Sequence, residues 1–167
     1  MSFPEAQASR LQAISFDVDG VLTNGAITYT DDGRELKTFN VQDGAATKLL
    51  INAGIHVAWI TGRSSAMVSR RAKELGVVHL YQGNEQKTAA FDDFLVKVGV
   101  PAEQTAHVGD DLPDLVLFDR AALGISVPNG HPDVQRAAAW ITETRGGDGV
   151  VSEIARLVLK AQAKWSY

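Results

Sequence analysis

The sequence contains no cysteine, which excludes disulfides, thiol catalysis and thiolate metal sites. It has no apolar run close to the roughly 20 residues of a membrane-spanning helix. Its first ten residues, MSFPEAQASR, lack the basic and apolar segments of a signal peptide. Basic residues are fewer than acidic ones, 16 against 20, and the net charge is −4. This charge argues against a nucleic-acid or anionic membrane partner, and we expect a cytoplasmic protein.

The remaining composition is that of a globular protein. The 167 residues are 45% hydrophobic and 22% charged. A chain of this length can bury roughly 70% of its unfolded surface in one core. The sequence has no internal repeat and no low-complexity tract, so we expect one domain spanning residues 1–167.

Short apolar runs alternate with helical patterns along the chain. The runs predict strands at 11–16, 55–60, 77–81, 105–109, 122–126 and 139–142. The patterns predict helices at 43–54, 64–76, 84–99, 112–119, 131–138 and 149–165, the first of them opened by Asp43 and closed by Gly54. Because parallel strands need crossover connections, these units indicate an α/β fold: a Rossmann-like parallel sheet with helices on both faces.

Residues 26–41, AITYTDDGRELKTFNV, interrupt this alternation. Two β-rich runs, near 26–30 and 35–40, flank Asp32-Gly33, a pair typical of hairpin turns. We therefore expect a small β-hairpin inserted between the first strand and the first helix. Two strands alone are marginally stable in water, and these carry the apolar side chains Ile27, Tyr29, Leu36 and Phe39.

Polar residues follow the predicted strands at the sheet edge where such folds bind ligands. They are Asp17 and Asp19 after the first strand, Thr61 and Arg63 after the second, Lys87 after the third, and Asp110, Asp111 and Asp114 after the fourth. Three converging carboxylates repel one another, and a hard cation such as Mg²⁺ relieves this repulsion. A hydroxyl and an ammonium group suit a phosphate. The set is typical of an enzyme that forms an aspartyl phosphate.

These segments carry a resemblance to a known family. DVDGVLTNG, ITGR, the lone lysine and GDDLPDL resemble the four motifs of the haloacid dehalogenase (HAD) superfamily. FNVQDG, HLYQGNEQK, VGDDLPDL and RGGDGVVSEI further resemble the 3-deoxy-D-manno-octulosonate 8-phosphate (KDO 8-phosphate) phosphatases, which are cap-less tetramers of lipopolysaccharide precursor synthesis. The resemblance covers nearly the whole chain. It implies a magnesium-dependent phosphatase that hydrolyses KDO 8-phosphate to KDO and phosphate.

The resemblance also implies roles for individual residues. Asp17 is then the nucleophile and a Mg²⁺ ligand, Asp19 is the general acid–base and a ligand through its backbone carbonyl, and Asp110 is the third ligand. Thr61 and Lys87 hold the phosphoryl oxygens. The implied substrate contacts are Asp19, Asn40, Asp43, Gly44, Lys48, Arg63, Arg71 and Lys87. At position 48 the family pattern has arginine, and lysine keeps its charge but loses the bidentate carboxylate contact.

The spacing of the first two aspartates has a physical reason. Asp17 at a strand end can aim at phosphorus, and a strand residue two positions on, Asp19, points the same way. Asp19 can then protonate the leaving oxygen, and Gly20 lets the backbone turn away.

Several alternatives remain open. Phospho-accepting signalling domains gather similar residues, although their phosphorylated aspartate follows a middle strand, where this chain has Thr61-Gly62-Arg63. Related phosphatases act on nine-carbon sugar-acid phosphates of the sialic acid or KDN type. Arg63 and Arg71 could be solvated, and Asn40 and Asp43 could end the hairpin and cap a helix. The four histidines lack metal-ligand spacing, so we expect them to be structural or exposed.

HAD enzymes often close over a small substrate with a separate cap domain, and the only insertion in this sequence is the short hairpin at 26–41. A neighbouring subunit could enclose the substrate instead. Four hairpins that close on one another would remove their open edges, and the resemblance implies a tetramer. We therefore expect a homotetramer with active sites at subunit interfaces. We also expect Gly146 and Gly147 to form a flexible joint before the last helix, near a neighbour's active site by resemblance.

Overall fold

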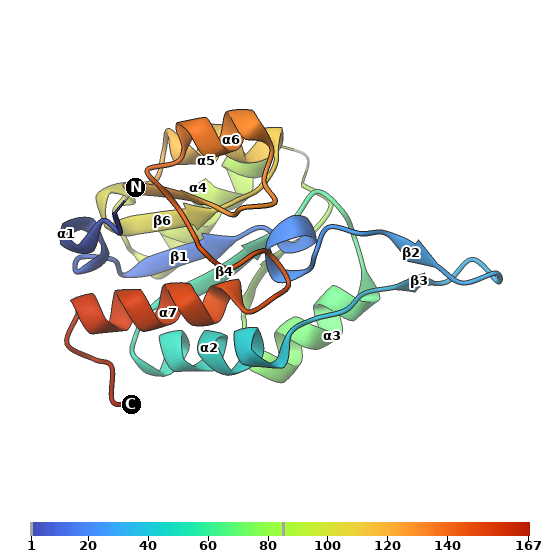
Figure 1. The fold of residues 1–167 in the computed structure, drawn as a ribbon, viewed down its shortest axis with the longest axis horizontal. Helices are drawn as coiled ribbons and strands as arrows, with labels where there is room; N and C mark the ends of the chain where they lie inside the picture. The colour runs from blue at the N-terminus through green and yellow to red at the C-terminus, as the bar shows by residue number, and fades with distance from the viewer. Residues whose placement is uncertain (1, 85) are drawn as a thin grey trace.

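A six-stranded parallel sheet forms the centre of the computed structural model, which describes residues 2–84 and 86–167 (Figure 1). The strand order is β5-β4-β1-β6-β7-β8. The strands are β1 (Ala13–Phe16), β4 (His56–Ile60), β5 (His79–Tyr81), β6 (Thr105–Val108), β7 (Leu123–Ser126) and β8 (Trp140–Ile141). Every predicted strand is present, and β1 lies in the middle of the sheet between β4 and β6. The predicted fold class is confirmed.

Helices cover both faces of the sheet (Figure 1). One face carries α2 (Val41–Asn52), α3 (Ala66–Leu75) and α7 (Val150–Ala161). The other carries α4 (Lys87–Val98), α5 (Leu115–Phe118) and α6 (Pro132–Ala137). Successive residues of β4 point to opposite faces of the sheet. Trp59 packs in the core under the first group of helices, whereas Ala58 and Ile60 pack with Phe91 and Phe94 of α4.

Smaller elements complete the fold. A short helix α1 (Glu5–Ala8), which we did not predict, precedes β1, and 3₁₀ turns cover Ala102–Gln104 and Leu112–Asp114. Position 85 of the predicted helix 84–99 lies outside the described residues. None of the helices in the described part of the chain is both long and apolar enough to cross a membrane.

The hairpin projects away from the sheet (Figure 1). Its strands β2 (Thr28–Tyr29) and β3 (Glu35–Leu36) pair antiparallel and are shorter than predicted. Tyr29 and Leu36 are more than half exposed. Phe39 behaves differently, because it is partly buried and its ring stacks on that of Trp59 with centroids 6.4 Å apart.

The start of α2 differs from the prediction. The helix begins after Asn40, whose side chain accepts a hydrogen bond from the Gln42 N–H at 2.8 Å. The predicted N-cap, Asp43, lies inside the helix and caps α7 instead, accepting from the N–H groups of Val151 and Ser152 at 2.8 and 3.3 Å. The prediction was wrong because this tertiary contact joins residues far apart in the sequence.

Candidate active site

The carboxyl ends of β1 and its two neighbours meet at a cavity of about 510 Å³. Its lining includes six of the predicted site residues: Asp17, Asp19, Thr61, Arg63, Lys87 and Asp110. The parallel topology brings them together although they are spread over more than half of the chain. The predicted cluster at the strand ends is therefore present in the fold.

A buried ion pair lies at the base of this cavity. Asp17 directly follows β1, and Lys87 is the first residue of α4. The Lys87 Nζ donates to Asp17 Oδ1 at 2.7 Å and to Asp114 Oδ1 at 2.6 Å. Burial favours the neutral amine, but the two carboxylates outweigh it and raise the pKa of Lys87. Lys87 is therefore a fixed positive charge beside Asp17.

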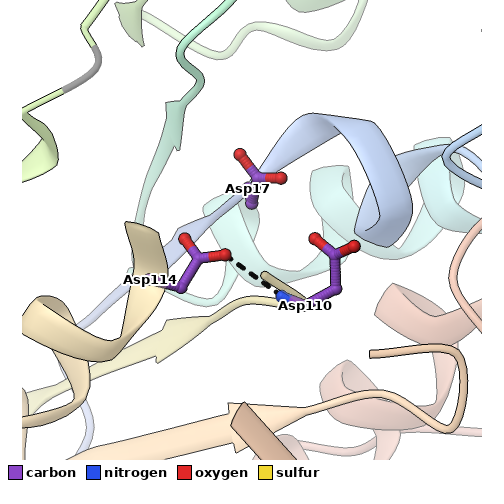
Figure 2. Close-up of side chains that lie close together, drawn as sticks. All are labelled: Asp17, Asp110 and Asp114. Atoms are coloured by element: carbon purple, nitrogen blue, oxygen red, sulfur yellow. Dashed lines mark hydrogen bonds between the residues drawn. The ribbon is translucent and has the colours of Figure 1, made fainter. Parts of the chain in front are cut away.

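The carboxylates crowd one another, as Figure 2 shows for Asp17, Asp110 and Asp114. Each offers an oxygen, and these atoms lie within 4.8 Å of one another. Burial, and next the charge of Asp114, raises the pKa of Asp17 to about 6. Burial and the charges of Asp17 and Asp114 raise the pKa of Asp110 to about 8. A bound divalent cation would offset this repulsion.

Asp114 is a fully buried member of the cluster, which the sequence analysis placed at the strand ends without giving it a role. Its Oδ1 accepts from Lys87 and His107. Its Oδ2 accepts from the N–H groups of Asp110 and Asp111, both at 3.1 Å, and Figure 2 draws the first of these two bonds. Burial opposes ionisation, but His107 and Lys87 outweigh it and lower the pKa of Asp114 to about 2. Both oxygens are thus occupied, and Asp114 orients its neighbours. Its place in GDDLPDL, four residues after Asp110, was the available signal.

Asp110 has the free oxygen that Asp114 lacks. Its Oδ1 is buried and has no hydrogen-bond partner among the described residues. A Cβ on Gly20 would lie 1.9 Å from Asp110 Oδ2, and Gly20 has φ +104°, so this position requires glycine. Carboxylate and carbonyl oxygens are the ligands that Mg²⁺ prefers. The residues present therefore fit a magnesium ion.

Asp19 lies beyond the strand, which ends at Phe16, in the turn Val18–Leu22. Its φ and ψ, −83° and 106°, are extended and not helical values, as are those of Asp17, −67° and 164°. Asp17 and Asp19 both line the cavity, as their spacing of two residues in extended backbone predicts. The role of Gly20 in the turn is confirmed.

A second buried layer supports the ion pair from behind. The Nε2 of His107 lies 2.8 Å from Asp114 Oδ1, and its Nδ1 lies 2.8 Å from the Ser15 hydroxyl. Burial lowers the pKa of His107, so the ring is neutral. A carboxylate only accepts, so Nε2 carries the proton and Nδ1 accepts from Ser15. The prediction that this histidine is structural is confirmed.

The hairpin also reaches the cavity. Lys37 forms an ion pair with Asp19, and its Nζ lies 3.7 Å from Glu35 Oε1. Glu35 accepts from Arg63 Nη2 at 2.9 Å. Thr61, at the end of β4, is buried and accepts from the Arg63 N–H at 3.2 Å. We did not predict Lys37 as a site residue, because a single lysine on a hairpin carries no distinguishing pattern.

The other predicted substrate contacts lie elsewhere. Asn40, Asp43, Gly44 and Arg71 line a much smaller cavity of about 10 Å³ that α2 and α3 contribute to. A Cβ on Gly44 would lie 2.2 Å from Arg71 Nη2, so the glycine makes room for the guanidinium. None of the four lines the larger cavity, and Lys48 is exposed on α2. Their contact with substrate stays a prediction.

Gly146 and Gly147, which precede α7, contact the turn Val18–Leu22 of their own chain. A Cβ on Gly146 would lie 1.7 Å from the Gly20 carbonyl oxygen, and the Gly147 N–H donates to Val21 O at 2.9 Å. The Asn129 side chain joins the segments, donating to Gly20 O at 2.8 Å and accepting from the Gly146 N–H at 2.7 Å. The prediction of a flexible joint is wrong, because close packing holds both glycines.

Known proteins resemble this chain in sequence. The haloacid dehalogenase-like hydrolase family matches residues 76–154. The KDO 8-phosphate phosphatase of Salmonella typhi is 41% identical over 158 residues, which cover 95% of this chain and 84% of that protein. The corresponding enzyme of Escherichia coli strain K12 is 41% identical over 159 residues, with 95% and 85% covered.

Solved structures agree with these relatives. The KDO 8-phosphate phosphatase of Yersinia pestis has a TM-score of 0.94 at 39% identity, over 96% of this chain and 86% of that one. The enzyme of Moraxella catarrhalis, in complex with magnesium, phosphate and KDO, has a TM-score of 0.92 at 45% identity, over 95% and 91%. By fold, motifs and sequence, this chain belongs to the KDO 8-phosphate phosphatase family of the HAD superfamily.

Proposed function

We propose that this protein is a magnesium-dependent phosphatase that hydrolyses KDO 8-phosphate to KDO and inorganic phosphate, in lipopolysaccharide precursor synthesis. The observation that carries the proposal is the cavity at the strand ends, where Lys87 holds Asp17 and Asp110 keeps a free oxygen. Family membership supports it, as does the Moraxella catarrhalis enzyme with magnesium, phosphate and KDO.

In the first half of the reaction, a carboxylate oxygen of Asp17 attacks phosphorus. A bond forms between that oxygen and phosphorus, and the bond from phosphorus to the sugar oxygen breaks. Asp19 gives a proton to the departing oxygen, because an alkoxide is a poor leaving group. Lys87 and the Thr61 hydroxyl contact the phosphoryl oxygens and balance their charge.

In the second half, a water molecule attacks the aspartyl phosphate on Asp17. Asp19 now accepts a proton from this water, which makes the water a stronger nucleophile. The bond between Asp17 and phosphorus breaks, phosphate leaves and both carboxyl groups return to their starting states. Asp114 and His107 keep Lys87 in place throughout.

Asp17, Asp110 and the backbone carbonyl of Asp19 would hold Mg²⁺. When bound, the ion supplies positive charge that neutralises the transferring phosphoryl group.

The proposal includes assembly as a homotetramer with active sites completed across subunits. Its support is the exposed apolar side of the hairpin, together with the position of Arg71, which lines a different cavity from the catalytic one. Replacing Ile27 and Leu36 together by aspartate should give smaller species in light scattering, with weakened KDO 8-phosphate turnover. Tyr29 is left intact because its side chain lies close to that of Arg63 and raises the pKa of Arg63. A wild type that is fully active as a monomer would refute the assembly.

The substrate is tested by a panel of eight- and nine-carbon 2-keto-3-deoxy sugar phosphates, with phosphate release measured with Mg²⁺, with a chelator and with Ca²⁺. We expect the highest kcat/KM for KDO 8-phosphate, no turnover in chelator and inhibition by Ca²⁺, whose larger shell misplaces the attacking oxygen. A preference for a nine-carbon 9-phosphate would redirect the assignment, and full activity in chelator would refute it. The cytoplasmic location stays a prediction for cell fractionation.

A further inference from the structure

The two carboxylate oxygens of Asp19 have different surroundings. Lys37 donates to Oδ1, whereas Oδ2 is buried and has no hydrogen-bond partner within residues 2–84 and 86–167. Asp19 also lines the catalytic cavity. Lys37 therefore holds the Asp19 carboxylate through one oxygen while the residue lines the cavity.

Lys37 is unusually placed for a hairpin lysine. Its side chain is only 3% exposed, and a buried ammonium group needs carboxylate partners. It has two, Asp19 and Glu35, and Glu35 in turn accepts from Arg63 at 2.9 Å. Negative and positive side chains therefore alternate along a row. The row joins the turn Val18–Leu22 to the hairpin and to the end of β4, and its members are Asp19, Lys37, Glu35 and Arg63. Such a row fixes the side chains that belong to it.

The geometry points to Lys37 as a positioning residue for the general acid–base. By holding Oδ1 of Asp19, it fixes the orientation of the carboxyl group at the cavity, and it exchanges no proton itself. This inference rests on the proposed function, in which a proton moves from the Asp19 carboxyl group to the leaving oxygen as the bond to phosphorus breaks. The hairpin thus contributes to catalysis within its own chain, in addition to any role in assembly.

Leaving-group basicity separates this role from a structural one. A basic leaving group needs a well-placed proton donor, whereas a weakly basic one departs with little help. Phenyl phosphate and p-nitrophenyl phosphate have similar shapes but differ in this respect. Their kcat/KM values report the steps up to the first phosphoryl transfer, in which the phenol departs.

The experiment measures kcat/KM for both esters in Mg²⁺ with the wild type, Lys37→Met and Lys37→Arg. Lys37→Met should lose about tenfold more activity toward phenyl phosphate than toward p-nitrophenyl phosphate, a fraction of the effect of a general acid. Lys37→Arg should recover part of that difference, because it restores a donor to Oδ1. Arg34→Met is the matched control: Arg34 lies on the same hairpin, is exposed and pairs with Asp32. It should match the wild type on both esters.

A double-mutant cycle completes the test. In an Asp19→Asn background, Lys37→Met should not change the ratio between the esters, because no acid remains to be positioned. Equal losses on both esters, or a change of ratio in that background, would overturn the inference and leave the proposed function intact. A wild type that hydrolyses neither the esters nor KDO 8-phosphate in Mg²⁺ would overturn both. Thermal unfolding checks that each variant folds, and Lys37→Gln carries the comparison if Lys37→Met does not.

Discussion

The catalytic cavity and the surface formed by the hairpin, α2 and α3 are built in different ways. In the cavity, Asp17, Lys87 and Asp114 are buried and joined by hydrogen bonds of 2.6–2.7 Å. On the surface, Tyr29 and Val41 are largely exposed, and a groove of about 390 Å³ runs past Arg70 and Arg71. The hydrogen bonds of the first region lie within one chain, whereas the second region has exposed apolar groups beside arginines that pair with Glu74.

The difference separates chemistry from specificity. Phosphoryl transfer needs charges fixed before the substrate arrives, and a buried network supplies that order. Selection of a sugar acid needs groups that surround the sugar, and within one chain the predicted contacts Asn40, Asp43 and Arg71 do not line the catalytic cavity. Lys37 and Arg63 connect the two regions through Glu35.

The largest expected effect is in the cavity. Asp17→Asn should lower kcat for any phosphate ester by about 10⁴-fold or more, because an amide cannot attack phosphorus. Phosphate release measures the loss, and thermal unfolding should show a folded protein. The control Asp119→Asn removes an exposed carboxylate from the end of α5 and should keep wild-type turnover. Substantial turnover by the Asp17 variant would remove the nucleophile from the account.

Gly20→Ala tests whether Asp110 and the turn Val18–Leu22 together form one metal site. The new Cβ would meet Asp110 Oδ2, so we expect Mg²⁺ affinity to fall by about 100-fold. Titration of activity with Mg²⁺ measures this. Gly54→Ala is the matched control, because Gly54 also has a positive φ, +84°, but nothing within 4 Å of the added atom. Equal Mg²⁺ affinity in the two variants would show that backbone strain alone matters.

Arg63→Ala tests the boundary between the regions. If Arg63 contacts the sugar acid's carboxylate, KM for KDO 8-phosphate should rise by about tenfold, as for a lost charged hydrogen bond. KM for p-nitrophenyl phosphate should change little. Arg120→Ala breaks another exposed arginine–carboxylate pair, with Asp92, and should alter neither value because neither residue lines the catalytic cavity. Equal rises for both substrates would assign Arg63 to phosphate binding or to structure.

The smallest effect concerns stability and pH. Burial raises the pKa of Asp43 from 3.8 to about 6, so the folded protein favours the protonated carboxyl. The stability from this group is complete below pH 3.8 and is lost as the pH rises through about 6. Asp43→Asn keeps an oxygen acceptor for the Val151 N–H and should flatten the fall in Tm between about pH 4 and 7. The control Asp31→Asn changes an exposed residue at the hairpin turn and should leave the fall in Tm as it is in the wild type. An unchanged pH profile in the Asp43 variant would contradict the assignment.

The sequence predicts what depends on local pattern and parallel topology. Strand ends place Asp17, Lys87 and Asp110 at one edge, and the structure brings them there. It does not predict contacts between distant residues: Ser15 with His107, or Asp43 as the cap of α7. The hairpin strands are shorter than their β-rich pattern suggests, because within residues 2–84 and 86–167 they pair only with each other. Lys37 was missed since only the folded hairpin brings it to Asp19.

The most direct test of the account is to trap the phosphorylated protein. The wild type is mixed with KDO 8-phosphate and Mg²⁺, quenched in acid within the first turnover, and its peptides are analysed by mass spectrometry. We predict one phosphoryl group on Asp17, labile to hydroxylamine and absent from Asp17→Asn. Two results would contradict the claim that the buried aspartate at the end of β1 is the nucleophile: a phosphoryl group on another residue, or a burst of free phosphate with no phosphorylated peptide.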